Sequence, residues 1–367
     1  MQTISIGMMT PTSTIRPMGK DYDRAFRKSI ESTLKNTDFE VEIFTEMIGQ
    51  GSVQKIEEAL DKFFGFHDVD CVTGIMSQAG IQNLTEKFDK KEKPLVCSNL
   101  GEHFPLLDSE SKCVFQNSIH LWQQAWNLGY YAGSELGSRG SVIAAVYDSG
   151  YAFLPAFQFG LLFANPNAFL DIKLLEMPVG GGLSDVKSIF DTVDWDGSDF
   201  VFPLFCGEEA TIFLKEFKDR RLNEKTQLLG LPFLLERGTE DLSGISVYTS
   251  SESYNEQTPD PYCKDVFAML GNRAGKAIGK AIIKDNGSPK FETLNQVLRS
   301  EGNSLYQLCE SPRFLGPIHI LKNTFGSGDS LSTERLKEQE YNISEDNQLN
   351  ELRRGVNSSW INPYLGI

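Results

Sequence analysis

Few side chains in this sequence are suited to metal binding or to nucleophilic catalysis. Its 367 residues include only four histidines, which are not grouped, and six cysteines that form no CxxC pair. Zinc sites and histidine-based catalytic triads need such groups in matched sets. The glycine run 180–182 lacks the Lys and Ser/Thr of a phosphate-binding loop. We therefore expect no metal, no cofactor and no enzymatic activity.

The sequence also lacks an excess of basic residues and long apolar runs. Fifty acidic and 35 basic residues give a formal net charge of −15, which repels phosphate backbones and anionic lipid. No stretch approaches the ~20 apolar residues that cross a bilayer. We expect neither nucleic acid as a partner nor membrane insertion.

A secretory leader has a basic segment followed by an apolar one. The N-terminus of this sequence has neither. If Met1 is native, we expect a cytoplasmic protein, and if a signal sequence has been removed, a periplasmic one. Cys71, Cys97 and Cys113 lie in apolar, strand-like runs, where a free cysteine behaves as a small buried hydrophobe. We expect all six cysteines to be unpaired, which favours a reducing compartment.

The first 120 residues alternate apolar, strand-like runs with segments of helical periodicity. This order is typical of a parallel sheet with helices on both faces. The predicted strands are 3–8, 39–44, 69–76 and 94–97, and the predicted helices are 21–34, 53–64 and 79–88.

The same order then starts again. A long helix is predicted after Asn117 and Ser118, with Ser118 as its N-cap. The strands that follow are predicted at 141–147, 169–175, 199–204 and 227–231, and the helices at 153–163, 184–193 and 208–217. This repetition predicts an α/β fold of two doubly wound, Rossmann-like lobes joined by a hinge.

The predicted lobe boundaries follow from where the pattern restarts and where it ends. Residues 1–118 plus about 250–322 would form the N-terminal lobe, because helix 263–283 and the apolar run 316–321 still need a sheet to pack on. Residues 119–249 would form the C-terminal lobe. A stripe of Gly and Ala along helix 263–283 predicts close packing against another element. The polar tail 323–367 is expected on the surface, as loops or a helix.

Four segments lie at predicted strand ends: 10–13, 69–74 running into Ser77, 147–151 and 198–202. Together with the order of the elements, they resemble the type 1 periplasmic-binding-protein superfamily, and most closely its branched-chain amino acid and amide solute-binding proteins. The similarity covers about residues 3–322 and is one of element order and spacing.

The resemblance implies a ligand cleft between the lobes, lined by loops at the carboxyl ends of the strands. Carried over position by position, the ligand-binding residues would be Thr12, Ser13, Ser77, Gln78, Ser98, Asn99, Tyr151, Phe205 and Cys206. As alternatives, Ser77, Gln78, Ser98 and Asn99 would be helix caps and turn residues, Tyr151 would be a packing residue, and Cys206 would be a buried thiol.

The sequence departs from the family at one position. Amino-acid binders of this family hold the ligand's ammonium with an acidic residue after the strand that corresponds to 227–231, but here the apolar segment 231–235 comes before Glu236. An ammonium left unpaired in a closed cleft is costly. We therefore expect an amide-like ligand or an amino-acid derivative with a flat or aliphatic body, and no ion pair with a carboxylate at 231–235.

Two classes of function remain open from the sequence. The first is a ligand-binding protein, which would act either as a soluble receptor for a membrane permease of the ABC-transporter type or as a sensor that controls a cytoplasmic regulator. The second is a structural or assembly protein that has kept the fold without binding a ligand.

Overall fold

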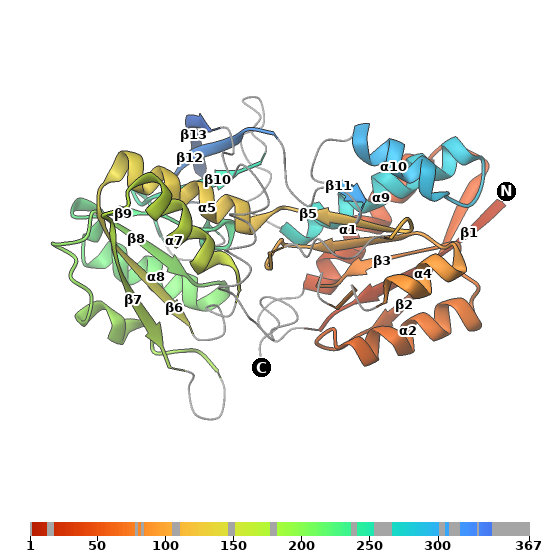
Figure 1. The fold of residues 1–367 in the computed structure, drawn as a ribbon, viewed down its shortest axis with the longest axis horizontal. Coiled ribbons are helices and arrows are strands. Elements are labelled where there is room, and N and C mark those ends of the chain that lie inside the picture. The colour runs from red at the N-terminus through yellow and green to blue at the C-terminus, as the bar shows by residue number, and fades with distance from the viewer. Residues whose placement is uncertain are drawn as a thin grey trace. The chain divides into compact units, whose positions relative to one another are not determined.

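The computed structural model describes residues 2–12, 18–77, 80–81, 84–104, 111–145, 151–176, 182–235, 241–252, 266–300, 305–307, 316–328 and 330–339. They form two compact units (Figure 1). Of the described residues, 2–120 and 266–307 belong to unit 1, and 121–252 and 316–339 belong to unit 2.

Unit 1 is built on a mostly parallel sheet with the strand order β11-β5-β4-β3-β1-β2. Only β11 runs antiparallel to its neighbour. Every residue of β3, β4 and β5 is buried, as expected for central strands covered on both faces. The strands are β1 (Gln2–Thr10), β2 (Phe39–Met47), β3 (Cys71–Ile75), β4 (Leu95–Asn99), β5 (Val114–Ser118) and β11 (Leu305–Gln307).

The helices of unit 1 bury one apolar stripe each. In α2, Ile56, Leu60 and Phe63 enter the core, and Ser52 caps the first turn by accepting the N–H of Lys55. Glycines of α9 let it lie directly on α1, since a Cβ at Gly271 would stand 2.3 Å from the carbonyl oxygen of Tyr22. The helices are α1 (Met18–Leu34), α2 (Val53–Gly65), α4 (Thr85–Lys91), α9 (Val266–Asp285) and α10 (Phe291–Ser300).

Unit 2 repeats this plan with a parallel sheet in the order β7-β6-β8-β9. As in unit 1, the second strand along the chain lies at one edge, beside the first. A smaller antiparallel sheet has the order β10-β12-β13. The strands are β6 (Arg139–Ala145), β7 (Phe169–Leu175), β8 (Phe200–Leu204), β9 (Gln227–Leu228), β10 (Ser246–Ser251), β12 (Ile318–Phe325) and β13 (Leu331–Gln339).

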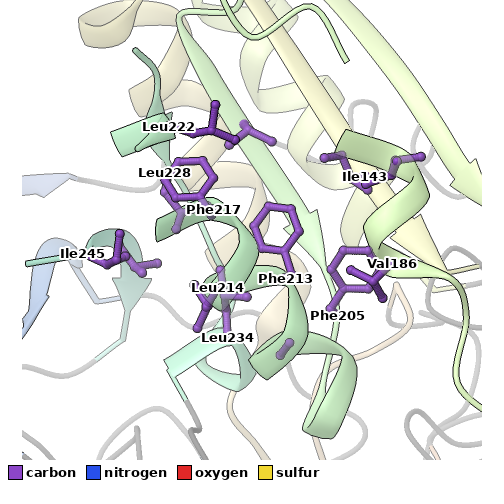
Figure 2. Packing of buried hydrophobic residues seen from close by; sticks show 14 of the residues in the cluster. Ile143, Val186, Phe205, Phe213, Leu214, Phe217, Leu222, Leu228, Leu234 and Ile245 are labelled. Carbon is purple, nitrogen blue, oxygen red and sulfur yellow. The ribbon is translucent and has the colours of Figure 1, made fainter. Parts of the chain in front are cut away.

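The helices of unit 2 enclose an aromatic core. Phe205, Phe213 and Phe217 pack together with aliphatic side chains from both sheets (Figure 2).

Helices α5 and α7 touch through glycine, since a Cβ at Gly129 would stand 2.0 Å from the carbonyl oxygen of Phe157. The helical segments are α5 (Leu121–Tyr131), η1 (Ala132–Leu136), α7 (Phe153–Ala164), η2 (Val186–Asp191), α8 (Gly207–Asp219), η3 (Leu222–Glu224) and η4 (Pro232–Leu235).

The predicted α/β architecture of two units with parallel sheets is confirmed, but the predicted boundaries are wrong in part. The apolar run at 316–321 was expected in the N-terminal lobe, yet β12 pairs with β10 in unit 2. Within the tail expected as loops or a helix, Leu331–Gln339 is a strand paired with β12. Backbone pairing decides both cases, and hydrophobic periodicity carries no information about the partner strand. Residues 340–367 lie outside the described residues.

Two further sequence expectations concern cysteines and membranes. Cys71, Cys97, Cys113 and Cys206 are buried and form no disulfide among the described residues, and Cys263 and Cys309 lie outside the described residues. No helix in the described part of the chain is long and apolar enough to span a membrane.

Candidate functional site

Polar side chains gather where three neighbouring strands of unit 1 end. Strands β1, β3 and β4 are parallel and adjacent, so their carboxyl ends share one edge of the sheet. Thr12 follows β1 and is exposed, with its backbone N–H bonded to the carbonyl of Gly49 at 2.9 Å. Ser77 and Asn99 lie at the ends of β3 and β4. This edge is where open α/β sheets bind ligands.

Ser77 and Asn99 both support the local chain. The Ser77 hydroxyl accepts the N–H of Gly80 at 3.0 Å, as a helix cap does. The Asn99 side-chain oxygen accepts the N–H of Gly101 at 3.0 Å, and its amide donates to Gln116. A ligand role for either residue stays a prediction. Gln78 and Ser13 lie outside the described residues.

Ser98 belongs to a buried network beneath this edge. Its hydroxyl donates to Tyr22 at 3.0 Å and accepts from the Asn117 amide at 2.9 Å. The Tyr22 hydroxyl also bonds Thr73 at 2.8 Å, and the Asn117 amide bonds the carbonyl of Leu270 at 2.8 Å. Burial raises the pKa of Tyr22, so the network stays neutral. It joins α1, β3, β4, β5 and α9, and the Ser98 hydroxyl is engaged within it.

Glu102, three residues after β4, is a candidate site residue that the sequence reasoning missed. Its side chain is 1% exposed, and one carboxyl oxygen accepts the N–H of Leu100 at 3.0 Å. The other oxygen, Oε1, is buried and has no hydrogen-bond partner. Burial raises the pKa of Glu102 to about 7, because the charged form is poorly solvated there. The buried Cys97 thiol interacts with it electrostatically. Buried carboxyls with a raised pKa are enriched at functional sites, which makes Glu102 a candidate.

Two buried aromatic side chains and a buried cysteine follow strands of unit 2. Tyr151 is buried after β6, with its ring centroid 5.7 Å from that of Phe153. Phe205 follows β8 and lies in the core, 5.5 Å from Phe213 (Figure 2). Cys206 is buried just before α8 and its side chain does not cap the helix. A ligand contact through these three residues stays a prediction.

Glu209, in the first turn of α8, is the second residue that was missed. It was interpreted as part of an acidic helix start, but its side chain is only 2% exposed. One carboxyl oxygen accepts the N–H of Ser184 at 2.6 Å, and the N-terminal end of the helix favours the negative charge. The other oxygen, Oε2, is buried without a partner, as is the Ser184 hydroxyl. Unit 2 therefore presents an unused acceptor beside an unused hydroxyl.

The apolar segment 231–235 packs inward. Residues Pro232–Leu235 form η4, all four are buried, and Leu234 and Leu235 belong to the core of unit 2. Core burial accounts for their apolar character. The segment therefore gives no support for an apolar ligand body, contrary to the sequence interpretation. Glu236 lies outside the described residues. Among those that are described, no group of three or more acidic, His or Cys side chains is placed to hold a metal ion.

The sequence matches no protein-family model and no curated protein. Solved structures do resemble this protein. A solute-binding protein of an ABC transporter from Rhodopseudomonas palustris BisB5, in complex with 3,4-dihydroxybenzoic acid, has a TM-score of 0.66 at 14% identity, with 92% of this chain and 98% of that chain covered.

Two further structures agree. An ABC-transporter substrate-binding protein from Sphaerobacter thermophilus has a TM-score of 0.68 at 16% identity, with 93% of this chain and 98% of that chain covered. A leucine-binding protein from Thermotoga maritima has a TM-score of 0.62 at 16% identity, with 92% of this chain and 99% of that chain covered. These likenesses extend over nearly the whole chain. The chain therefore has the type 1 periplasmic-binding-protein fold, as the resemblance in its sequence implied.

Proposed function

We propose that this protein binds a small organic molecule at the carboxyl edge of a parallel sheet, and that it acts by binding and not by catalysis. The observation that carries the proposal is the pair of buried carboxyl oxygens without partners, Oε1 of Glu102 and Oε2 of Glu209. A buried acceptor left unpaired costs about 1–3 kcal/mol. A ligand that donates hydrogen bonds would recover that cost.

The ligand class follows from the chemistry of these groups. The unpaired Oε2 of Glu209 can accept a hydrogen bond, so Glu209 fits an N–H or O–H donor of the ligand. Glu102, with a pKa raised to about 7, can accept when ionised or donate when protonated. An amide-like molecule or an amino-acid derivative offers both kinds of partner. Glu209 would then supply the acidic anchor that the segment 231–235 lacks.

The biological role that fits this fold is indicated by the similar structures. These are described as solute-binding or substrate-binding proteins of ABC transporters. We propose that this protein likewise delivers its ligand to a membrane permease, which would place it in the periplasm or an equivalent compartment. The interlobe cleft expected from the resemblance stays a prediction.

A thermal-shift screen tests the proposal. The panel would contain hydroxybenzoates, aliphatic amides, free amino acids and N-acylated amino acids. A compound at a hundredfold excess over its dissociation constant stabilises the folded protein by about 2.7 kcal/mol, which gives a clear rise in Tm. Glu209→Gln should reduce that rise, and Glu208→Gln, an exposed neighbour on the same turn, should keep it.

Two outcomes would count against the proposal. A panel without any shift would favour the alternative function, a structural or assembly protein that has kept the fold. An equal shift in the wild type and in Glu209→Gln would place the ligand away from Glu209.

A further inference from the structure

Strand β7 lies at an edge of the parallel sheet in unit 2, and among the described residues it pairs with β6 alone. It is the outermost strand of the order β7-β6-β8-β9 (Figure 1). Phe169, Ile172 and Leu174 are 59%, 39% and 50% exposed. Edge strands with exposed apolar side chains are templates for pairing with another strand.

The backbone groups available for such pairing can be identified from the existing ladder. The N–H of Phe169 donates to Ser138 at 2.7 Å, on the side of β6. Because successive residues of a strand direct their N–H and C=O groups to opposite sides, Leu170, Ile172 and Leu174 direct theirs away from β6. These three residues would hydrogen-bond an added strand.

The charges of β7 select both the partner and the register. Asp171 and Lys173 flank Ile172 and form an ion pair with each other at 3.1 Å. If a second β7 runs antiparallel with its Ile172 opposite this Ile172, each Asp171 lies opposite the other copy's Lys173. A register centred on Asp171 or on Lys173 would instead place like charges opposite each other, which is destabilising.

We propose that β7 pairs with β7 of a second copy of this chain, antiparallel and centred on Ile172, to join two unit 2 sheets into one. Leu170 and Leu174 of the two strands form the flanking hydrogen-bonded pairs. Asp171 and Lys173 form the close, non-hydrogen-bonded pairs, where side chains approach most nearly.

The corresponding edge of unit 1 shows the opposite design. Strand β2 ends the other parallel sheet and carries Glu40, Glu42 and Glu46 with no basic residue. Self-pairing there would bring acidic side chains together, so β2 is protected by charge. The two edges therefore form a matched test and control within one chain.

Sedimentation velocity of the full chain, from about 1 to 500 μM, tests the proposal. An interface made of one strand from each copy is small, so the dimer should dissociate in the micromolar range. Ile172→Pro removes an outward-facing N–H and leaves the ladder to β6 intact, so the dimer should be lost. Ile43→Pro makes the same change at an outward-facing position of β2 and should leave the dimer unchanged.

Charge variants test the register. Asp171→Lys and Lys173→Asp should each weaken self-association about tenfold or more, because two attractive pairs become repulsive. An equimolar mixture of these two variants should form a heterodimer, since every cross-strand pair is then attractive. A chain that stays monomeric to 500 μM overturns the proposal, and so does a dimer that survives Ile172→Pro or a mixture that shows no heterodimer. If a different protein pairs with β7, this chain alone stays monomeric to 500 μM, and the proposed self-pairing is wrong.

Discussion

Glu209 accepts a hydrogen bond from the backbone N–H of Ser184 at 2.6 Å, and this contact joins the first turn of α8 to the segment that follows β7. The bond fixes one carboxyl oxygen and leaves the other without a partner. Because Ser184 donates through its backbone, its hydroxyl is not needed to hold Glu209. The hydroxyl is therefore a candidate for contact with the ligand.

Ser184→Ala should separate binding from stability. The variant keeps the backbone bond to Glu209 and removes a buried hydroxyl that has no partner, so the ligand-free Tm should stay within about 2 °C of the wild type. The Tm rise produced by the best compound of the screen should fall. Calorimetric titration of both proteins measures the loss, and an unchanged affinity would remove Ser184 from the site.

Glu102 predicts that stability falls as pH rises. Its pKa is about 7 in the folded protein, against an ordinary value of 4.5. Between these values the folded state keeps the proton and the unfolded state loses it, so the free energy of unfolding decreases with pH, by up to about 3 kcal/mol. Below about pH 4.5 the effect vanishes.

Glu102→Gln should flatten this dependence, because the amide does not titrate. Urea unfolding at about pH 5 and pH 7.5 measures it, as the difference between variant and wild type. Glu86→Gln, at a highly exposed position of α4, is the control and should follow the wild type. Parallel pH profiles for the wild type and Glu102→Gln would show that Glu102 titrates normally.

Tyr22→Phe should destabilise unit 1. The Tyr22 hydroxyl accepts from Ser98 and bonds Thr73, so its removal leaves buried polar groups unpaired, at a cost of about 1–3 kcal/mol. Tyr130→Phe is the matched control, since the Tyr130 ring packs on Trp126 and Phe163 and is retained. Denaturant unfolding should show a lower midpoint for Tyr22→Phe alone. Equal midpoints would mean that the network adds no stability.

Gly129→Ala should loosen the contact of α5 with α7. The added Cβ would stand 2.0 Å from a backbone oxygen of Phe157, so the helices must separate, at a cost of about 1–3 kcal/mol. Gly65→Ala, at the end of α2, meets nothing within 4 Å and should not destabilise the protein. A Gly129→Ala variant with the wild-type Tm would contradict the packing described for this pair.

The sequence predicted most of the fold because its elements repeat with clear periodicity. Strand β7 has the predicted bounds, and α7 and α8 extend past theirs by one and three residues. What periodicity cannot supply is the partner of a strand, so β12 was assigned to the wrong unit. Strand β13 was not predicted as a strand, because its residues are mostly polar and give no apolar face.

The site was harder to predict from the sequence. Residue type and position after a strand indicated the carboxyl edges, but Phe205 and the segment 231–235 serve the core, which depends on packing between elements distant in sequence. Glu102 and Glu209 stand out only through burial and an unpaired oxygen. Neither the burial nor the unpaired oxygen can be predicted from the neighbouring sequence.

Native mass spectrometry of the protein purified from its own cells, without denaturation, tests the central claim most directly. We predict a noncovalent adduct of a small organic molecule, lost on denaturation and reduced in Glu209→Gln but kept in Glu208→Gln. Only the bare mass of the chain in all three proteins, together with a panel that gives no thermal shift, would contradict the proposed function.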